Sequence, residues 1–116
     1  MRNDIDTKRK VYKMHKAKAK NHEKLIQQRN KEFDSITPHY CVGCGSHFRL
    51  SRAHIIRISL RKELEFDLNN MAYLCMSGPD RKGCHTIWDD GTLEEKRKLC
   101  CFDRFMKYIE SNKKKS

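Results

Sequence analysis

Apolar residues are thinly spread over the first 36 positions of the chain. They are Ile5, Val11, Tyr12, Met14, Leu25, Ile26 and Phe33. The segment contains no Gly or Pro and predicts a helix, but so few apolar side chains would hold that helix only weakly against a core. Because the residue before a proline is disfavoured in helical geometry, Thr37-Pro38 predicts the end of this exposed arm and the start of the core.

From residue 39 to residue 80 the pattern changes to one typical of short strands and turns. A turn at residues 41–45 precedes a stretch rich in Leu, Ile and Arg, which predicts one or two strands within residues 39–60. The β-branched residues that favour strand over helix there are Ile55, Ile56 and Ile58. Residues 71–75 predict a second strand, and the Ser-Gly-Pro-Asp run at 77–80 predicts a loop.

The C-terminal part of the chain has helical signals. Residues 84–89 predict a short helix that ends at Gly91, and Thr92 with Glu95 three residues later forms a capping box that opens one final helix. The apolar stripe of that helix comprises Leu93, Cys100, Cys101, Phe105, Tyr108 and Ile109. The organisation predicted is a basic helical arm (1–36), one domain (37–111) and a basic tail (112–116).

Composition and charge narrow the function classes. Only 37% of the 116 residues are hydrophobic, so the core needs support from something other than apolar burial. The net charge of +11, from 26 Lys and Arg against 15 Asp and Glu, indicates a polyanionic partner, and DNA is the natural candidate. No apolar span predicts a membrane association, and the polar first residues predict a reducing, cytoplasmic location. Cysteines there are metal ligands more often than disulfides.

Four cysteines have the spacing of a structural zinc site. Cys41 and Cys44 form a Cys-x2-Cys turn flanked by glycines, and Cys75 and Cys84 supply a second, more loosely spaced pair. Buried free thiols and a redox pair are the alternatives, and His47 is a spare ligand. Four thiolates would leave zinc no open position, so zinc would support the fold rather than the chemistry. Cys100 and Cys101 are interpreted as small core residues.

The residues between and after these cysteines resemble the HNH family of nucleases. The matching segments are Arg52-Ala-His54-Ile-Ile-Arg57, then Asn70-Met-Ala-Tyr-Leu-Cys75, then Cys84-His85. The match covers roughly residues 41–90, and several independent spacings agree. The resemblance implies an α+β fold with a small ββα-metal core, held by the four-cysteine zinc site and flanked by the basic helix and the C-terminal amphipathic helix.

The resemblance also implies the roles of individual side chains. His54 would be the general base, oriented through a backbone carbonyl, and His85 would bind a catalytic divalent ion, Mg2+ or Mn2+. Asn70 would either ligate that ion or brace the loop that carries His54, and its alternative is a turn-forming asparagine. Asp89, one helical turn after His85, is a further candidate ligand, although Asp90 competes with it.

Basic side chains are candidates for phosphate contacts, and the alternative for each is a solvated surface charge. Those close to His54 in sequence are Arg52, Arg57, Arg61 and Lys62. Those in the arm, which would add salt-sensitive affinity for DNA, are Lys8, Arg9, Lys10 and Lys13.

The expected function is a metal-dependent DNA endonuclease that leaves 3'-hydroxyl and 5'-phosphate ends. One departure from the family pattern favours an alternative: Ala53 stands where many members carry an acidic residue or histidine that binds the metal. A catalytically inactive zinc module that binds nucleic acid is therefore the second hypothesis, and a zinc-containing adaptor for another protein is the third. A monomer or weak dimer is expected, with other nucleic-acid-processing proteins as further candidate partners.

Overall fold

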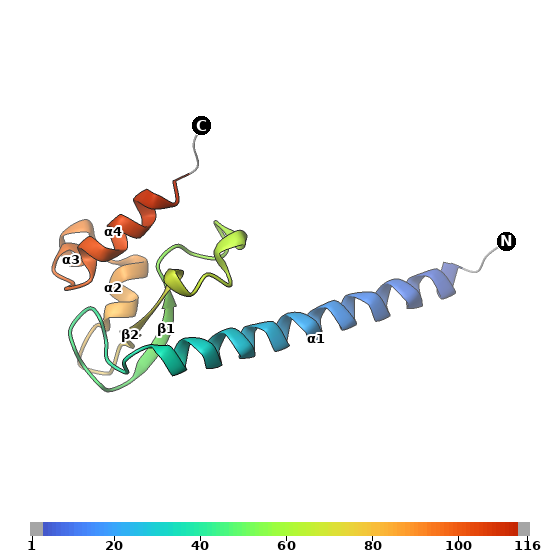
Figure 1. Cartoon of the computed structure of the whole chain (residues 1–116), viewed down its shortest axis with the longest axis horizontal. Helices are drawn as coiled ribbons and strands as arrows, with labels where there is room; N and C mark the ends of the chain where they lie inside the picture. Colours follow the sequence, from blue (N-terminus) through green and yellow to red (C-terminus); the bar gives the residue numbers. More distant parts are fainter. Residues whose placement is uncertain (1–3, 114–116) are drawn as a thin grey trace.

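The computed structural model describes the backbone of residues 4–113 and the side chains of residues 20–113. In chain order the elements are α1 (Asp4–Ile36), β1 (Leu50–His54), the 3-10 helices η1 (Lys62–Leu64) and η2 (Leu68–Asn70), β2 (Met71–Cys75), α2 (Cys84–Asp90), α3 (Leu93–Arg97) and α4 (Phe102–Ser111). The fold is a small α+β arrangement around a two-stranded antiparallel sheet (Figure 1). None of the described helices is both long and apolar enough to span a bilayer.

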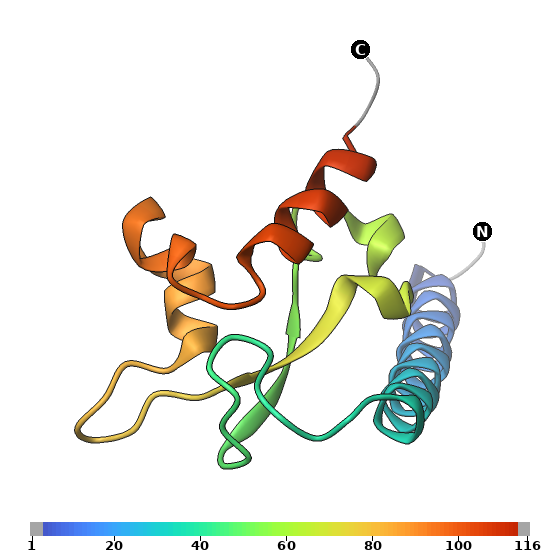
Figure 2. The same ribbon diagram turned by 60° about the vertical axis from the view of Figure 1, so that its left-hand side comes forward.

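The sheet separates two apolar clusters. Because side chains alternate along a strand, Ala72 and Leu74 of β2 face the cluster that includes residues of α2 and α4, whereas Met71 and Tyr73 pack with Phe33 of α1. Every residue of β2 is buried, which explains why this strand reads as a continuous apolar run. Figure 2 shows the sheet between α1 on one side and α2 with α3 on the other.

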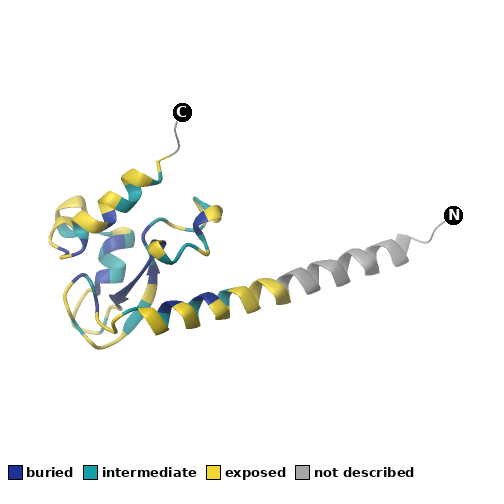
Figure 3. Ribbon diagram, viewed as in Figure 1, coloured by how far each residue is buried: buried dark blue, intermediate teal, exposed yellow. Residues whose placement is uncertain are grey.

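Helix α1 is anchored to the core through its last turns. Arg29 and Phe33, one turn apart, are buried, while most other side chains between residues 20 and 36 are exposed (Figure 3). Asp34 forms an ion pair with Arg52 of β1 and accepts a hydrogen bond from the Tyr73 hydroxyl of β2. The prediction of a largely solvated helix therefore holds for most of the described arm, but its last turns belong to the core.

Strand β1 confirms one strand within residues 39–60, but it ends at His54, so Ile55, Ile56 and Ile58, which favour strand by type, lie outside it. Two side chains from other elements, Trp88 of α2 and Asn70 of η2, bind the backbone of the segment that follows β1. The indole Nε1 of Trp88 donates to the carbonyl oxygen of Ile55 at 3.0 Å, and the Asn70 amide binds both backbone groups of Ile56. These contacts use backbone groups that a longer strand would present to a neighbouring strand.

Helix α2 confirms the prediction of a short helix after Cys84, and Gly91 follows its last residue as predicted. The capping box is also confirmed: Thr92 Oγ1 accepts from the backbone N–H of Glu95 at 3.2 Å, and the Glu95 carboxylate accepts from the N–H of Thr92 at 3.1 Å.

The prediction of one final helix is wrong, because the chain breaks between α3 and α4. The N–H of Cys100 donates to the carbonyl oxygen of Gly43 at 3.0 Å, which ties the break to the turn at residues 41–45. Leu99 and Cys101 on either side are buried in the core, whereas Cys100 is exposed, so only Cys101 is a core residue. The break lets Phe105 of α4 pack edge-on against Trp88 of α2, with ring centroids 4.9 Å apart.

Candidate functional site

The four predicted cysteines meet at one point of the core. The sulfur atoms of Cys41, Cys44, Cys75 and Cys84 all lie within 4.8 Å of one another. A zinc ion with four Zn–S bonds of about 2.3 Å in tetrahedral geometry places its sulfurs about 3.8 Å apart, and the Sγ atoms of Cys44 and Cys75 are 3.7 Å apart. The donor set therefore fits a structural zinc ion. His47, the spare ligand, lies outside this cluster, with its Nδ1 atom 3.1 Å from the carbonyl oxygen of His39.

Glycine is required in the turn that carries the first two cysteines. Gly45 has a φ of +80°, which side chains other than glycine rarely adopt, and its N–H donates to the carbonyl oxygen of Cys41 at 2.7 Å. A Cβ atom on Gly43 would lie 2.9 Å from the Sγ atom of Cys84. Gly45 is therefore required by the backbone conformation of the turn, and Gly43 by the close approach of the Cys84 sulfur.

Hydrogen-bond donors point at the sulfur atoms, as expected for thiolates. Backbone N–H groups of Cys75 and Cys84 donate to the Sγ atoms of Cys41 and Cys75 at 3.3 and 3.4 Å, and Arg81 Nη2 lies 3.0 Å from Cys75 Sγ. Burial raises the pKa of the Cys44 thiol, but hydrogen bonds from the Ser46 backbone and Arg81 outweigh it and lower that pKa to about 6. Burial raises the pKa of Cys84 and of Cys75, so a bound cation is the natural compensation for a fully ionised set.

His54 lies at the end of β1 with one ring nitrogen sealed from water. Its Nε2 atom is buried and has no hydrogen-bond partner among the described residues, so the bond to a backbone carbonyl that the family resemblance implies is not formed there. Burial lowers the pKa of His54, as do the positive charges of Arg29 and His85, while Glu65 and Asp89 oppose the shift. The imidazole is therefore neutral near pH 7 and can accept a proton.

Asn70 directs both ends of its amide at the segment that follows His54. The side chain is fully buried, with 0% exposure. Its Oδ1 atom accepts from the N–H of Ile56 at 2.7 Å, and its Nδ2 atom donates to the carbonyl oxygen of the same residue at 3.0 Å. Of the two roles predicted for Asn70, these contacts favour the brace over the metal ligand, because the amide oxygen already faces a backbone donor.

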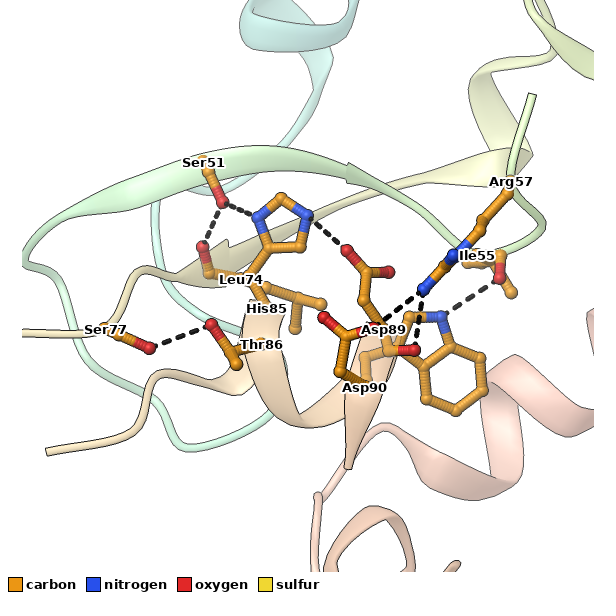
Figure 4. A network of polar contacts seen from close by, with 10 residues as sticks. Ser51, Ile55, Arg57, Leu74, Ser77, His85, Thr86, Asp89 and Asp90 are labelled. Atoms are coloured by element: carbon orange, nitrogen blue, oxygen red, sulfur yellow. Dashed lines mark hydrogen bonds and ion pairs between the residues drawn. The ribbon is translucent and has the colours of Figure 1, made fainter. Parts of the chain in front are cut away.

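His85 is held between a serine of β1 and a carboxylate of its own helix (Figure 4). Its Nδ1 atom lies 2.8 Å from Ser51 Oγ, and its Nε2 atom lies 3.1 Å from Asp89 Oδ2. Asp90 points elsewhere, to Arg57 at 3.2 Å, so Asp89 is the aspartate that lies beside His85, and its role as a metal ligand stays a prediction. The i, i+4 spacing on α2 brings the histidine and the carboxylate together.

The distance between these two donor atoms suits adjacent ligands of one hard cation. An octahedral Mg2+ with bonds of about 2.1 Å separates neighbouring ligand atoms by about 3.0 Å, compared with 3.1 Å between His85 Nε2 and Asp89 Oδ2. A proton on Nε2 would satisfy the same contact as an ion pair. Ala53, only 2% exposed, adds no ligand from β1.

The arginines predicted to bind phosphate have partners within the chain. Arg52 pairs with Asp34, and Arg57 donates to the carbonyl oxygen of Asp89 at 2.8 Å as well as to Asp90. Arg61 pairs with the Glu63 carboxylate and donates to the carbonyl oxygen of Asn112 at 2.6 Å. Their positive charge is thus partly neutralised, and a DNA contact stays a prediction for them.

The lysines differ in what the structure describes. Lys62 is exposed at the start of η1 and remains available to a phosphate. The predicted DNA contacts of the arm lie outside the residues whose side chains are described: Lys8, Arg9, Lys10 and Lys13.

Three side chains of the site were not among the predicted residues. Ser51 contacts His85, Arg81 contacts the cysteine cluster, and Arg29 is buried close enough to His54 for its charge to lower the pKa of that ring. For Ser51 a signal existed, because strand alternation puts it on the same face as position 53. Arg81 and Arg29 lie on a loop and on a sparse helix, where the sequence pattern gives no indication of contact.

Comparison with known proteins gives no match to any family model, curated protein or solved structure.

Proposed function

We propose that this chain is a metal-dependent HNH endonuclease that hydrolyses phosphodiester bonds of DNA. The observation that carries the proposal is the proximity of three groups: a half-buried histidine at the end of β1, a histidine–carboxylate pair on α2 whose charges act on the pKa of that histidine, and an asparagine that braces the segment after it. These are the residues that the family resemblance implies, and they lie beside a cysteine cluster that fits zinc.

His54 supplies the general base. Its Nε2 atom is buried, so the nitrogen that a water molecule can reach is Nδ1, and the proton of the neutral ring then resides on Nε2. Nδ1 accepts a proton from the attacking water, and the lowered pKa of the ring keeps it unprotonated before that step. Asn70 maintains the position of the ring by fixing the backbone at Ile56, two residues later.

His85 and Asp89 would hold the divalent ion, Mg2+ or Mn2+, through one nitrogen and one oxygen atom. When bound, such an ion stabilises negative charge on the phosphate and on the departing 3' oxygen. Two protein ligands would leave the remaining positions to water and phosphate oxygens, which Mg2+ accepts readily. The family resemblance implies products with 3'-hydroxyl and 5'-phosphate ends.

Cleavage of supercoiled plasmid in Mg2+ or Mn2+ tests the proposal. A single site cuts one strand in each event, so the open-circular form should precede the linear form. Replacing a general base costs about 100-fold or more in rate, so His54→Ala should lose at least that much while keeping its zinc. His47→Ala is the matched control, because His47 is an exposed histidine outside the site. Absence of cleavage with any divalent ion, or full activity of His54→Ala, would contradict the proposal.

The second candidate function is a zinc module that binds nucleic acid without cutting it. The buried Ala53 favours it, because this position supplies no metal ligand. It predicts salt-sensitive DNA binding that is unchanged by His54→Ala and His85→Ala. A metal-dependent cleavage product would reject it.

A further inference from the structure

The hydroxyl group of Ser51 lies between two hydrogen-bond partners that belong to different elements. Its Oγ atom is 2.8 Å from the carbonyl oxygen of Leu74 on β2 and 2.8 Å from Nδ1 of His85 on α2 (Figure 4). A carbonyl oxygen can only accept, and a hydroxyl group has a single proton to donate. The proton of Ser51 therefore goes to Leu74, and the Oγ lone pairs face His85.

This arrangement decides which nitrogen of His85 carries the proton. With Oγ acting as an acceptor, Nδ1 of His85 must be the donor. In the neutral ring the other nitrogen, Nε2, then has a free lone pair, and that lone pair points towards Asp89 Oδ2 at 3.1 Å. Two acceptors so close together need a cation between them, which a metal ion or a proton on Nε2 supplies.

We propose that Ser51 is a positioning residue that fixes the Nδ1–H tautomer of His85 and thereby prepares Nε2 and Asp89 to bind a divalent cation. Ser51 does not touch the ion itself, and it acts through the ring that it holds. The assignment rests on the proposed function for the identity of the site, but it makes a separate claim about metal affinity. Hydrogen-bond partners of a ligating histidine typically change metal affinity by about 10- to 100-fold when they are removed.

Two variants of nearly equal shape isolate the hydroxyl group. Ser51→Thr keeps it and Ser51→Val replaces it with a methyl group, and both residues suit a strand. Ser77→Ala is the matched control, because Ser77 bonds to Thr86 of the same helix at 2.8 Å without touching His85. His85→Ala defines the loss of the site. Each protein keeps its zinc, and its fold is checked by its amide spectrum.

The first measurement is the tautomer of His85 in the zinc-loaded protein without added Mn2+. Long-range 1H–15N correlation of the ring should find a proton on Nδ1 in the wild type and in Ser51→Thr, whether or not Nε2 also carries one. Ser51→Val should shift the proton towards Nε2. A wild-type ring protonated on Nε2 alone would overturn the assignment.

The second measurement is the dissociation constant for Mn2+, by titration calorimetry with paramagnetic broadening of α2 amides to locate the ion. It should stay within about threefold of wild type in Ser51→Thr and Ser77→Ala and rise by about 10-fold or more in Ser51→Val. Equal affinities of the Thr and Val variants, or wild-type binding no tighter than that of His85→Ala, would overturn the proposed role of Ser51.

The two proposals fail separately. If the Mn2+ affinities differ as expected but plasmid is not cleaved, the endonuclease proposal is rejected and the role of Ser51 stands. If plasmid is cleaved but the Thr and Val variants bind Mn2+ equally, the endonuclease stands and the role of Ser51 is rejected.

Discussion

The cysteine cluster and the His85–Asp89 pair both gather metal-binding atoms, but they differ in how completely they enclose the space between them. Four sulfur atoms from the turn at residues 41–45, β2 and α2 surround one point, and three of the four cysteines are buried. The His85–Asp89 pair comes from one helix and contributes two donors, both partly exposed. A closed set suits an ion that supports the fold, whereas an open pair leaves room for water and substrate. On the proposed function, the chain separates stability from chemistry in two neighbouring sites that share α2.

The largest expected effect is on the closed site. Structural zinc contributes on the order of 10 kcal/mol to small domains, so Cys84→Ser should lose bound zinc and with it the cooperative unfolding transition. Zinc analysis and thermal unfolding followed by circular dichroism measure both. Cys100→Ser, which changes an exposed thiol outside the cluster, should keep its zinc and unfold like the wild type. Retention of stoichiometric zinc by Cys84→Ser would show that this residue is not a ligand.

A smaller loss of stability is expected when Asn70 is replaced. Its size tests whether Asn70 braces the backbone or binds the metal. Asn70→Ala leaves both backbone groups of Ile56 without their partners, which should lower the free energy of unfolding by about 2–4 kcal/mol. Urea denaturation measures this loss, and Asn69→Ala, its exposed neighbour, should change stability by less than about 0.5 kcal/mol. If Mn2+ affinity falls in Asn70→Ala as far as in His85→Ala, then Asn70 is a ligand instead of a brace.

The same contrast between the sites explains what the sequence could predict. Strand β2, helix α2 and the capping box depend on local patterns and local hydrogen bonds, and all three are found where the sequence predicts them. The cysteines of the cluster lie far apart in the chain, but the preference of zinc for four thiolates predicts that they meet. The break after α3 depends on a bond between Cys100 and Gly43, which lie far apart in the chain, and no local signal predicts it. The anchoring of α1 likewise depends on Asp34 meeting Arg52 and Tyr73. Both features depend on polar contacts between residues far apart in the chain, which the periodicity of apolar residues does not predict.

The smallest expected effect is the pH dependence of cleavage, and its sign follows from the surroundings of His54. Burial, Arg29 on α1 and His85 on α2 lower the pKa of His54 below its ordinary value of 6.5, against the opposing charges of Glu65 and Asp89. The base is active when neutral, so this group should change the rate by less than about twofold between pH 7 and 8, and by about tenfold per unit only below its lowered pKa. The lowered pKa also means that His54 binds a proton more readily in the unfolded chain than in the folded protein. The contribution of neutral His54 to the free energy of unfolding is therefore present above pH 6.5 and declines as the pH falls below it.

Single-turnover cleavage measured against pH, at saturating metal, locates this acid limb. Arg29→Met removes a buried positive charge beside the ring and should move the limb to higher pH, because protonation of His54 is then less disfavoured. Arg104→Met, an exposed arginine on α4, serves as the control and should leave the limb in place. A wild-type limb centred above 6.5 would mean that the titrating base is not a half-buried histidine in this environment. A limb that His54→Ala leaves intact would assign it to another group, and the open site would then need a different base.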